Sequence, residues 1–338
     1  MKNPLSIVSI ILMVFITSLF CGEYGDSFLR LGVSARAIAM GNSIGSLDTT
    51  ETAFISNPAG LAYQDKFRIG IMYTSQFGLA DHNYIGLSLP VLKKPQTSLT
   101  FSWVRFQVGD LIYRPNILVD ISDPEARRDS VISFANKPFS TFQERDEAIF
   151  ISLARLFNKN ISLGWKYANL NLNIPIGLNF KIIRKQLADN RGTGLGLDLG
   201  TGLKINGAAL TNIYNFGDLY LGLSIRDLLG TTIYWNTKKQ DRISRSTIFS
   251  LAFAQPLKFY NSILNLCSEI DTRYNTYRLG VEFDLNRKIA FRTGLNDKQA
   301  AIGLGLKFHL LSRLIHLDYS FKSHDLGATH RIGGGLAW

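Results

Sequence analysis

The fold of this chain is indicated most clearly by residues 277–285, which read Tyr-Arg-Leu-Gly-Val-Glu-Phe-Asp-Leu. Apolar residues occupy every odd position of this stretch, while Arg278, Gly280, Glu282 and Asp284 occupy the even positions. A period of two places the two sets on opposite faces of an extended strand. The stretch therefore predicts a β-strand with one apolar face and one polar face.

The same alternation recurs from about Phe67 to the end of the chain. It is found at residues 161–167, 174–182, 195–203, 219–226, 264–270, 289–295, 302–309 and 315–321. The polar face is rich in Gly and Ser and carries charges of both signs in mid-strand, at Lys166, Lys181, Asp198, Glu269, Asp271, Arg292 and Asp318. Such a face suits a crowded polar lumen better than the exposed face of a soluble sandwich. We therefore predict an all-β chain that forms a transmembrane antiparallel β-barrel.

The lengths of the segments and of their connections predict the size of the barrel. Segments of about nine to eleven residues are long enough for a tilted strand to cross the hydrocarbon of a bilayer. Since single-chain bacterial barrels have an even number of strands, we predict about fourteen, with about sixteen as the alternative. Short turns are predicted at 158–160, 286–287 and 296–298, and long extracellular loops at 107–144 and 236–245.

The first residues have the order of a secretory signal peptide. Lys2 gives a basic start, residues 5–20 are almost all apolar, and a short stretch of small or turn-forming residues follows at 21–25. This order predicts export, with a retained anchor and lipidation of Cys21 as alternatives. We predict a signal peptide at 1–22, an N-terminal segment at 23–63 and the barrel at 64–338, in the outer membrane of a bacterial cell.

Charge and cysteine content narrow the partners. The formal net charge is +11, but no block rich in Lys and Arg occurs, so we predict contact with anionic outer-membrane lipids and no nucleic acid. The chain has two cysteines, Cys21 and Cys267. Cleavage near Cys21 leaves Cys267 alone, so neither an intrachain disulfide nor a zinc site of paired cysteines is expected.

The last residues carry a second signal. Ile332, Leu336 and the terminal Trp338 fall on one face of the final strand. A terminal aromatic residue with apolar residues at alternate upstream positions is typical of the signal read by the outer-membrane barrel assembly machinery. The alternative is an ordinary last strand that ends in tryptophan.

Residues 26–63 do not alternate and consist largely of small side chains. The run that contains Ala35, Arg36, Met40 and Gly41 predicts a short helix that ends at a glycine. The sequence Asn57-Pro58-Ala59-Gly60 predicts a rigid turn, because proline fixes its own φ and keeps the residue before it out of the helical region. Small residues favour close packing, so we predict that this segment packs tightly against other backbone, with the lumen of the barrel as one place for it.

The segments 28–32, 35–41 and 57–61 together resemble the opening of PorV/PorQ-family proteins, which are related to FadL-type channels. The resemblance implies a fourteen-stranded barrel whose N-terminal segment folds into the lumen as a hatch. By the same analogy, the turn at residues 57–60 acts as the plug, and a small backbone shift at Pro58 opens a path. In the FadL type, hydrophobic compounds bind outside, pass a plugged lumen and leave sideways into the membrane. In the PorV type, the barrel serves the type IX secretion machinery as a shuttle or anchoring component. The resemblance thus implies a channel or binding protein for hydrophobic small molecules, with a structural or shuttle role in protein secretion as the alternative.

Catalytic motifs are not recognisable in the sequence. The glycines of residues 192–200 alternate mainly with leucine, as in a strand, and do not open a helix as in a nucleotide-binding loop. The five histidines have no metal-binding spacing, and no serine stands in a nucleophile motif. We therefore predict neither an enzyme nor a metal or cofactor site, with an outer-membrane phospholipase as the alternative.

Overall fold

A computed structural model describes residues 25–91, 96–113, 121–135, 140–162, 169–324 and 327–338. The predicted signal peptide lies outside the described residues, as does Lys166. Within these ranges, no helix is both long enough and apolar enough to cross a membrane.

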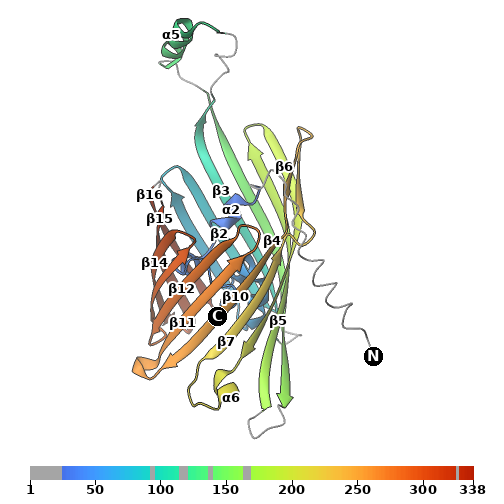
Figure 1. Cartoon of the computed structure of the whole chain (residues 1–338), viewed down its shortest axis with the longest axis vertical. Helices are drawn as coiled ribbons and strands as arrows, with labels where there is room; N and C mark the ends of the chain where they lie inside the picture. Colours follow the sequence, from blue (N-terminus) through green and yellow to red (C-terminus); the bar gives the residue numbers. More distant parts are fainter. Residues whose placement is uncertain (1–24, 92–95, 114–120, 136–139, 163–168, 325–326) are drawn as a thin grey trace, which may run out of the picture.

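Fourteen antiparallel strands form a closed ring (Figure 1). They are β1 (Arg68–Gln76), β2 (Ala80–Pro90), β3 (Thr97–Ile112), β4 (Thr141–Ser162), β5 (Asn169–Leu187), β6 (Asn190–Ile205), β7 (Asp218–Arg226), β10 (Ser246–Leu257), β11 (Ser262–Asp271), β12 (Thr276–Leu285), β13 (Ile289–Asn296), β14 (Gln299–Leu310), β15 (Arg313–His324) and β16 (Gly327–Ala337). The ring closes because β1 pairs with both β2 and β16. The predicted strand number is confirmed.

Two further strands extend the sheet beyond the ring. β8 (Thr231–Trp235) and β9 (Gln240–Ile243) form a hairpin in the connection between β7 and β10. β8 pairs with residues 192–194 of β6, above the part of β6 that pairs with β7.

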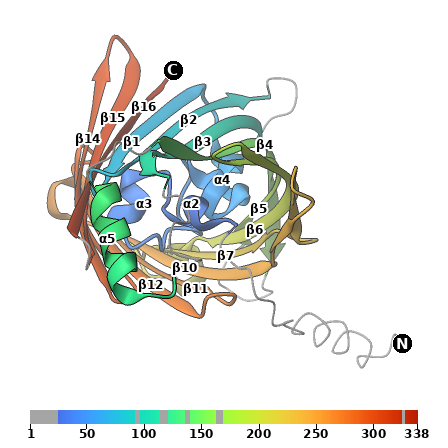
Figure 2. The ribbon, with the colours of Figure 1, turned by 90° about the horizontal axis from the view of Figure 1, so that it is seen from above.

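The helices divide between the lumen and the connections. Seen from above, α2 (Ser27–Arg30), α3 (Ala35–Ala39) and α4 (Ala53–Ser56) lie inside the ring (Figure 2). The 3-10 helix η2 (Pro58–Tyr63) follows α4 and contacts β3, β4, β5 and β6. α5 (Pro124–Ala135) stands beyond the ends of β3 and β4, and α6 (Gly207–Thr211) and η3 (Phe259–Asn261) lie in connections at the opposite end. The chain is therefore an all-β barrel with an N-terminal helical segment in its lumen, as predicted.

The two faces of the wall differ as the alternation predicts. In β12, Leu279 and Val281 point outward and are exposed, whereas Arg278 and Glu282 point inward and are buried. Since an apolar outer face is stable only against an apolar solvent, and a closed ring leaves no strand edge unpaired, the barrel suits the hydrocarbon of a membrane.

The connections differ at the two ends of the barrel. One end, the long-loop end, carries the connections 113–140 and 227–245, and the other, the short-turn end, carries turns such as 286–288 and 311–312. The predicted turn at Asn286–Arg287 is confirmed, with φ of 52° and 55°.

Three predicted loop boundaries are wrong. Residues 107–144 are not all loop, because β3 continues to Ile112, β4 begins at Thr141, and α5 lies between them. Residues 236–245 contain β9, and the turn predicted at 158–160 lies inside β4, where it pairs with residues 171–173 of β5. In each case the strands continue past the apolar band, where polar residues remain compatible with a β-ladder because water solvates their side chains.

The C-terminus lies beside the start of β1. Trp338 N donates to Phe67 O at 3.1 Å, Phe67 N donates to Trp338 O at 3.2 Å, and the two rings stack at 5.9 Å. Ile332 and Leu336 lie on the outward face of β16. The role of these residues as an assembly signal stays a prediction.

We expect Leu304→Arg to lower the free energy of unfolding by about 2–4 kcal/mol, the cost of an arginine at the bilayer midplane. Leu304 is 49% exposed at the centre of β14, so the change would be nearly neutral if this face met water. The matched control is Leu311→Arg, at a position 89% exposed in a short turn. The measurement is equilibrium unfolding in lipid vesicles, and equal stabilities of the two variants would contradict a lipid-facing wall.

Candidate functional site

The hatch, residues 25–63 in the structure, fills the lumen with apolar side chains. Phe54 of α4 packs between Tyr84 of β2 and Phe150 of β4, with ring centroids at 5.8 and 4.8 Å. Phe28, Leu61 and Val104 belong to the same buried cluster. The hatch is thus held by a hydrophobic core that it shares with inward-facing residues of the barrel wall.

A pair of wall glycines lets the end of α3 approach the backbone of the barrel. Ser34 caps the helix by accepting from Ala37 N at 3.3 Å, and Gly41 ends it with a φ of +65°. Gly280 of β12 and Gly294 of β13 are direct partners in the ladder. A Cβ added at Gly294 would lie 2.2 Å from Gly41 N, and one at Gly280 would lie 2.5 Å from Met40 O. Any other residue at these wall positions would displace the hatch.

A second pair of glycines receives the predicted Asn57-Pro58 turn. Gly177 of β5 and Gly200 of β6 are ladder partners, and a Cβ at Gly177 would lie 2.3 Å from Pro58 C. Asn57 Oδ1 accepts from Ala59 N at 3.0 Å, and Asn57 Nδ2 donates to Thr201 O at 3.0 Å. The turn is therefore a fixed point of the hatch, bonded to the wall and enclosed by it.

A chain of four charges anchors α3 to the barrel. Arg36 Nε and Nη2 donate to the two carboxylate oxygens of Glu282 at 2.9 and 2.7 Å. Arg292 Nε donates to Glu282 Oε2 at 2.6 Å, and Arg292 Nη1 donates to Asp318 Oδ1 at 2.6 Å. Since buried charges are stable only when paired and hydrogen-bonded, the network fixes Arg36 in one position.

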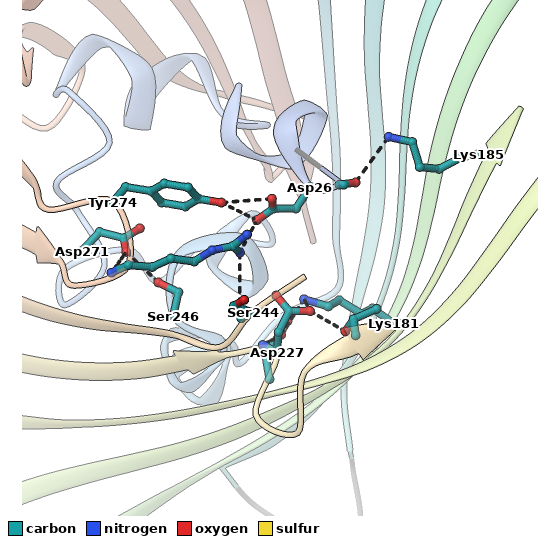
Figure 3. Close-up of polar contacts among 12 residues, drawn as sticks. Asp26, Lys181, Lys185, Asp227, Ser244, Ser246, Asp271 and Tyr274 are labelled. Carbon is teal, nitrogen blue, oxygen red and sulfur yellow. Dashed lines mark hydrogen bonds and ion pairs between the residues drawn. The ribbon is translucent and has the colours of Figure 1, made fainter. Parts of the chain in front are cut away.

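The start of the hatch is tied to the turn between β11 and β12 (Figure 3). The Asp26 carboxylate accepts from Tyr274 Oη at 3.1 Å and from Arg273 Nη1 at 3.2 Å. Arg30 lies over the Tyr274 ring at 3.6 Å. Burial and the neighbouring Asp26 carboxylate raise the pKa of the Tyr274 phenol, so this hydroxyl remains a donor.

Figure 3 also shows a buried ion-pair cluster on the wall below the β8–β9 hairpin. Lys181 Nζ of β5 lies 2.7 Å from Asp198 Oδ1 of β6 and 2.9 Å from Asp227 Oδ1 in the following connection. The cluster ties β5 and β6 to the start of the β7–β10 connection.

The sequence predicted only one side of these contacts. Ala35, Arg36, Met40, Gly41 and residues 57–60 all contact the wall or pack beside it, as a hatch requires. The partners Glu282, Gly294 and Gly200 were missed as hatch contacts. In the sequence, each of these residues is recognisable as a charged residue or a glycine on the inward face of a strand. Only the closed ring shows which of the inward residues face the hatch.

An apolar groove lies on the outer wall across β15, β16, β1, β2 and β3. It has a volume of about 840 Å³. Its outward residues are exposed and mostly apolar: Ile69, Ile71, Tyr73, Ile85, Leu317 and Ile332. Gly334 stands between Ile71 and Leu317 in the ladder, so the wall has no outward side chain at this point. We name this hollow the outer groove.

A small cavity lies behind the same stretch of wall, on the side of the lumen. It has a volume of about 20 Å³, room for one water, and is lined by hatch residues 33–36 and 50–52. The cavity and the outer groove share Ile71, Met72, His316, Gly333 and Gly334. The two hollows meet at the stretch where β1 and β16 are paired, throughout 68–75 of β1, and at His316 of β15.

Comparisons with known proteins find similar barrels among solved structures. No known family model matches the chain, and no curated protein matches it. Among solved structures, the Ralstonia pickettii toluene transporter TbuX is 9% identical with a TM-score of 0.43, and covers 90% of this chain and 97% of its own. The TodX deltaS2S3 mutant, a monoaromatic hydrocarbon channel, is 11% identical (TM-score 0.45; 90% and 98% covered). A Pseudomonas aeruginosa FadL homologue is 10% identical (TM-score 0.43; 90% and 97% covered). Similarities of this size establish neither a family nor a function, and the resemblance to PorV/PorQ proteins stays a prediction.

We expect Gly294→Ala to unseat the end of α3, because the added methyl group would overlap Gly41 N and the Met40 carbonyl carbon, each at 2.2 Å. The matched control is Gly109→Ala in β3, where an added Cβ would meet nothing within 4 Å. The measurement is single-channel conductance in planar bilayers. Raised conductance or longer openings are expected for Gly294→Ala alone, and a closed Gly294→Ala barrel would contradict the close fit of the hatch.

We expect the hatch to be seated less stably as pH rises. Burial raises the pKa of the Glu51 carboxyl, although His316 and Arg68 oppose the shift. The stabilisation from neutral Glu51 is complete below the ordinary glutamate pKa of about 4.3 and is lost as pH rises through the raised folded-state value. Glu51→Gln should therefore gain stability over the unaltered protein as pH rises in equilibrium unfolding, and the exposed control Asp65→Asn should not. A pH-independent difference for Glu51→Gln would contradict this.

Proposed function

We propose that this protein is a FadL-like channel of the bacterial outer membrane that passes hydrophobic small molecules, with the hatch as its gate. The observation that carries the proposal is the outer groove, which is apolar, opens toward the hydrocarbon and lies back to back with a cavity beside the hatch. A binding site of several hundred Å³ with mostly apolar walls suits a hydrophobic compound.

The hatch blocks free diffusion through the lumen. Two cavities between the hatch and the wall measure about 20 and 10 Å³, too small for a solute larger than water. A wider hollow of about 350 Å³ lies at the end of the hatch, beside Ala62 and Tyr63. A channel with this plug therefore opens only when part of the hatch moves. Residues 33–36 and 50–52 line the inner cavity, so we propose that these segments move, while the Asn57–Pro58 turn stays fixed against β5 and β6.

The proposed path leads sideways through the wall. Gly333 and Gly334 leave both faces of β16 without side chains at the point where the outer groove and the inner cavity meet. Since β16 is hydrogen-bonded to both β1 and β15 at this point, a solute passes only if these strands separate locally and several backbone hydrogen bonds break, together with a shift of Met72 and His316. A solute that leaves here enters the membrane directly, which favours hydrophobic over polar cargo.

We expect Ile85→Trp to reduce uptake of a hydrophobic probe severalfold, because the larger ring fills the outer groove that Ile85 lines. The matched control is Ile302→Trp, on the same outward face but away from the groove, which should leave uptake unchanged. The assay is entry of radiolabelled toluene into outer-membrane vesicles. Unchanged uptake in a folded Ile85→Trp protein would contradict the lateral path.

The role in protein secretion that the sequence predicts as an alternative depends on the long-loop end, where α5 stands above the barrel. Its test is co-purification from native membranes. Stoichiometric recovery of a secreted protein or of a secretion component would favour that role over transport.

A further inference from the structure

The upper outward face of β3, β4, β5 and β6 carries four arginines, in a row that the alternation alone would not predict. Arg105, Arg145, Arg184 and Arg191 share the outward face with apolar residues such as Ile149 and Ile182. Toward the long-loop end, the last apolar residue on the outward face is Ile149 in β4 and Ile182 in β5. Arg145 lies two outward positions beyond Ile149, and Arg184 lies one outward position beyond Ile182. We name these four residues the arginine row.

The register makes the arginine row continuous. Arg105 pairs with Glu147 and lies diagonal to Arg145, whose partner is Gln107. Arg145 pairs with Gln186 and lies diagonal to Arg184. Arg184 pairs with Glu147 on β4 and with Thr193 on β6, and it lies diagonal to Arg191. Diagonal neighbours in an antiparallel sheet are about 7–8 Å apart, close enough for two guanidinium groups to share one anion.

The positive charge of the row is only partly balanced. Glu147 is the one acid that forms an ion pair with the row among the described residues, and its Oε1 lies 3.9 Å from Arg105 Nε. In the same part of the chain, the guanidinium groups of Arg184 and Arg191 have no hydrogen bond or ion pair, and Arg145 Nε is buried without a partner. Four like charges on neighbouring strands repel one another unless an anion lies between them.

The arginine row is confined to one side of the barrel. On the described parts of β10 to β16, no outward strand position holds Lys or Arg except Arg313, at the short-turn end. A general need for solubility would distribute charge around the whole rim and would be met by lysine as well as arginine. A row of arginines without lysine suits phosphate, because the planar guanidinium donates two parallel hydrogen bonds to one phosphate group, whereas lysine acts as a point charge.

We propose that the arginine row binds the phosphate groups of an anionic lipid in the outer leaflet of the membrane. The proposal rests on the proposed location in the outer membrane, where long connections face outward and short turns face the periplasm. The row then lies at the level of the outer headgroups, with acyl chains against the apolar residues below it. Arg105 also lines the outer groove beside Trp103, so the lipid site and the groove adjoin.

The test compares lipid binding by two double variants of the full-length, detergent-purified protein. The probe is a diphosphorylated, hexa-acylated disaccharide lipid, and its retention is measured by native mass spectrometry. Since each arginine near an anionic lipid surface contributes about fivefold in affinity, Arg145→Gln with Arg184→Gln should bind about 25-fold more weakly. The matched control is Arg155→Gln with Arg313→Gln, two outward positions at the short-turn end, which should bind as the unaltered protein does.

Three results would overturn the proposal: equal binding by the two double variants, equal binding of the same lipid without its phosphates, or equally tight binding of inorganic phosphate alone. The result of this binding assay is independent of the test of the proposed channel, because lipid binding is measured without transport. Ile85→Trp should bind the lipid normally whether or not it takes up the hydrophobic probe.

Discussion

The closure of the β-ring is the constraint on which the rest of the structure depends. An outward face of Leu, Ile and Phe is stable in hydrocarbon only if no backbone N–H or C=O group is left without a partner there. Pairing of β1 with β16 and of β5 with β6 removes the strand edges that an open sheet would expose. Closure also encloses a lumen. The polar faces of the strands point into this lumen, toward one another and toward the hatch.

The interior is shaped by where the wall lacks side chains. Paired glycines at Gly280–Gly294 and Gly177–Gly200 bring the hatch backbone to the wall at two places, and the Arg36–Glu282 pair fixes it between them. On β16 the same absence of side chains has a different effect, because Gly334 faces outward and helps to form the outer groove. In this wall, an inward-facing glycine therefore makes room for the hatch backbone, whereas the outward-facing Gly334 leaves a hollow on the outer surface.

The outer surface is not uniform around the barrel. The outer groove occupies β15 to β3, the arginine row occupies β3 to β6, and the remaining strands present mainly apolar side chains. The strands that carry the arginine row are also the longest, from Thr97–Ile112 in β3 to Thr141–Ser162 in β4, and they continue beyond the apolar band. One side of the barrel therefore carries the arginine row above its apolar band, and the adjoining side carries the outer groove.

The sequence alone determined the fold class, the number of strands and the lumenal helix at Ala35, because these depend on local periodicity and on residues within a few positions of one another. It also placed glycines and charges on the inward face. It did not determine the strand ends at Ile112 and Thr141, nor the partners of Arg36 and Asn57, nor the arginine row. The strand ends and the arginine row depend on register, which is decided only when the ring closes and each strand aligns with both of its neighbours. The partners of Arg36 and Asn57 depend on how the hatch packs inside that ring, which joins residues as distant as Arg36 and Glu282.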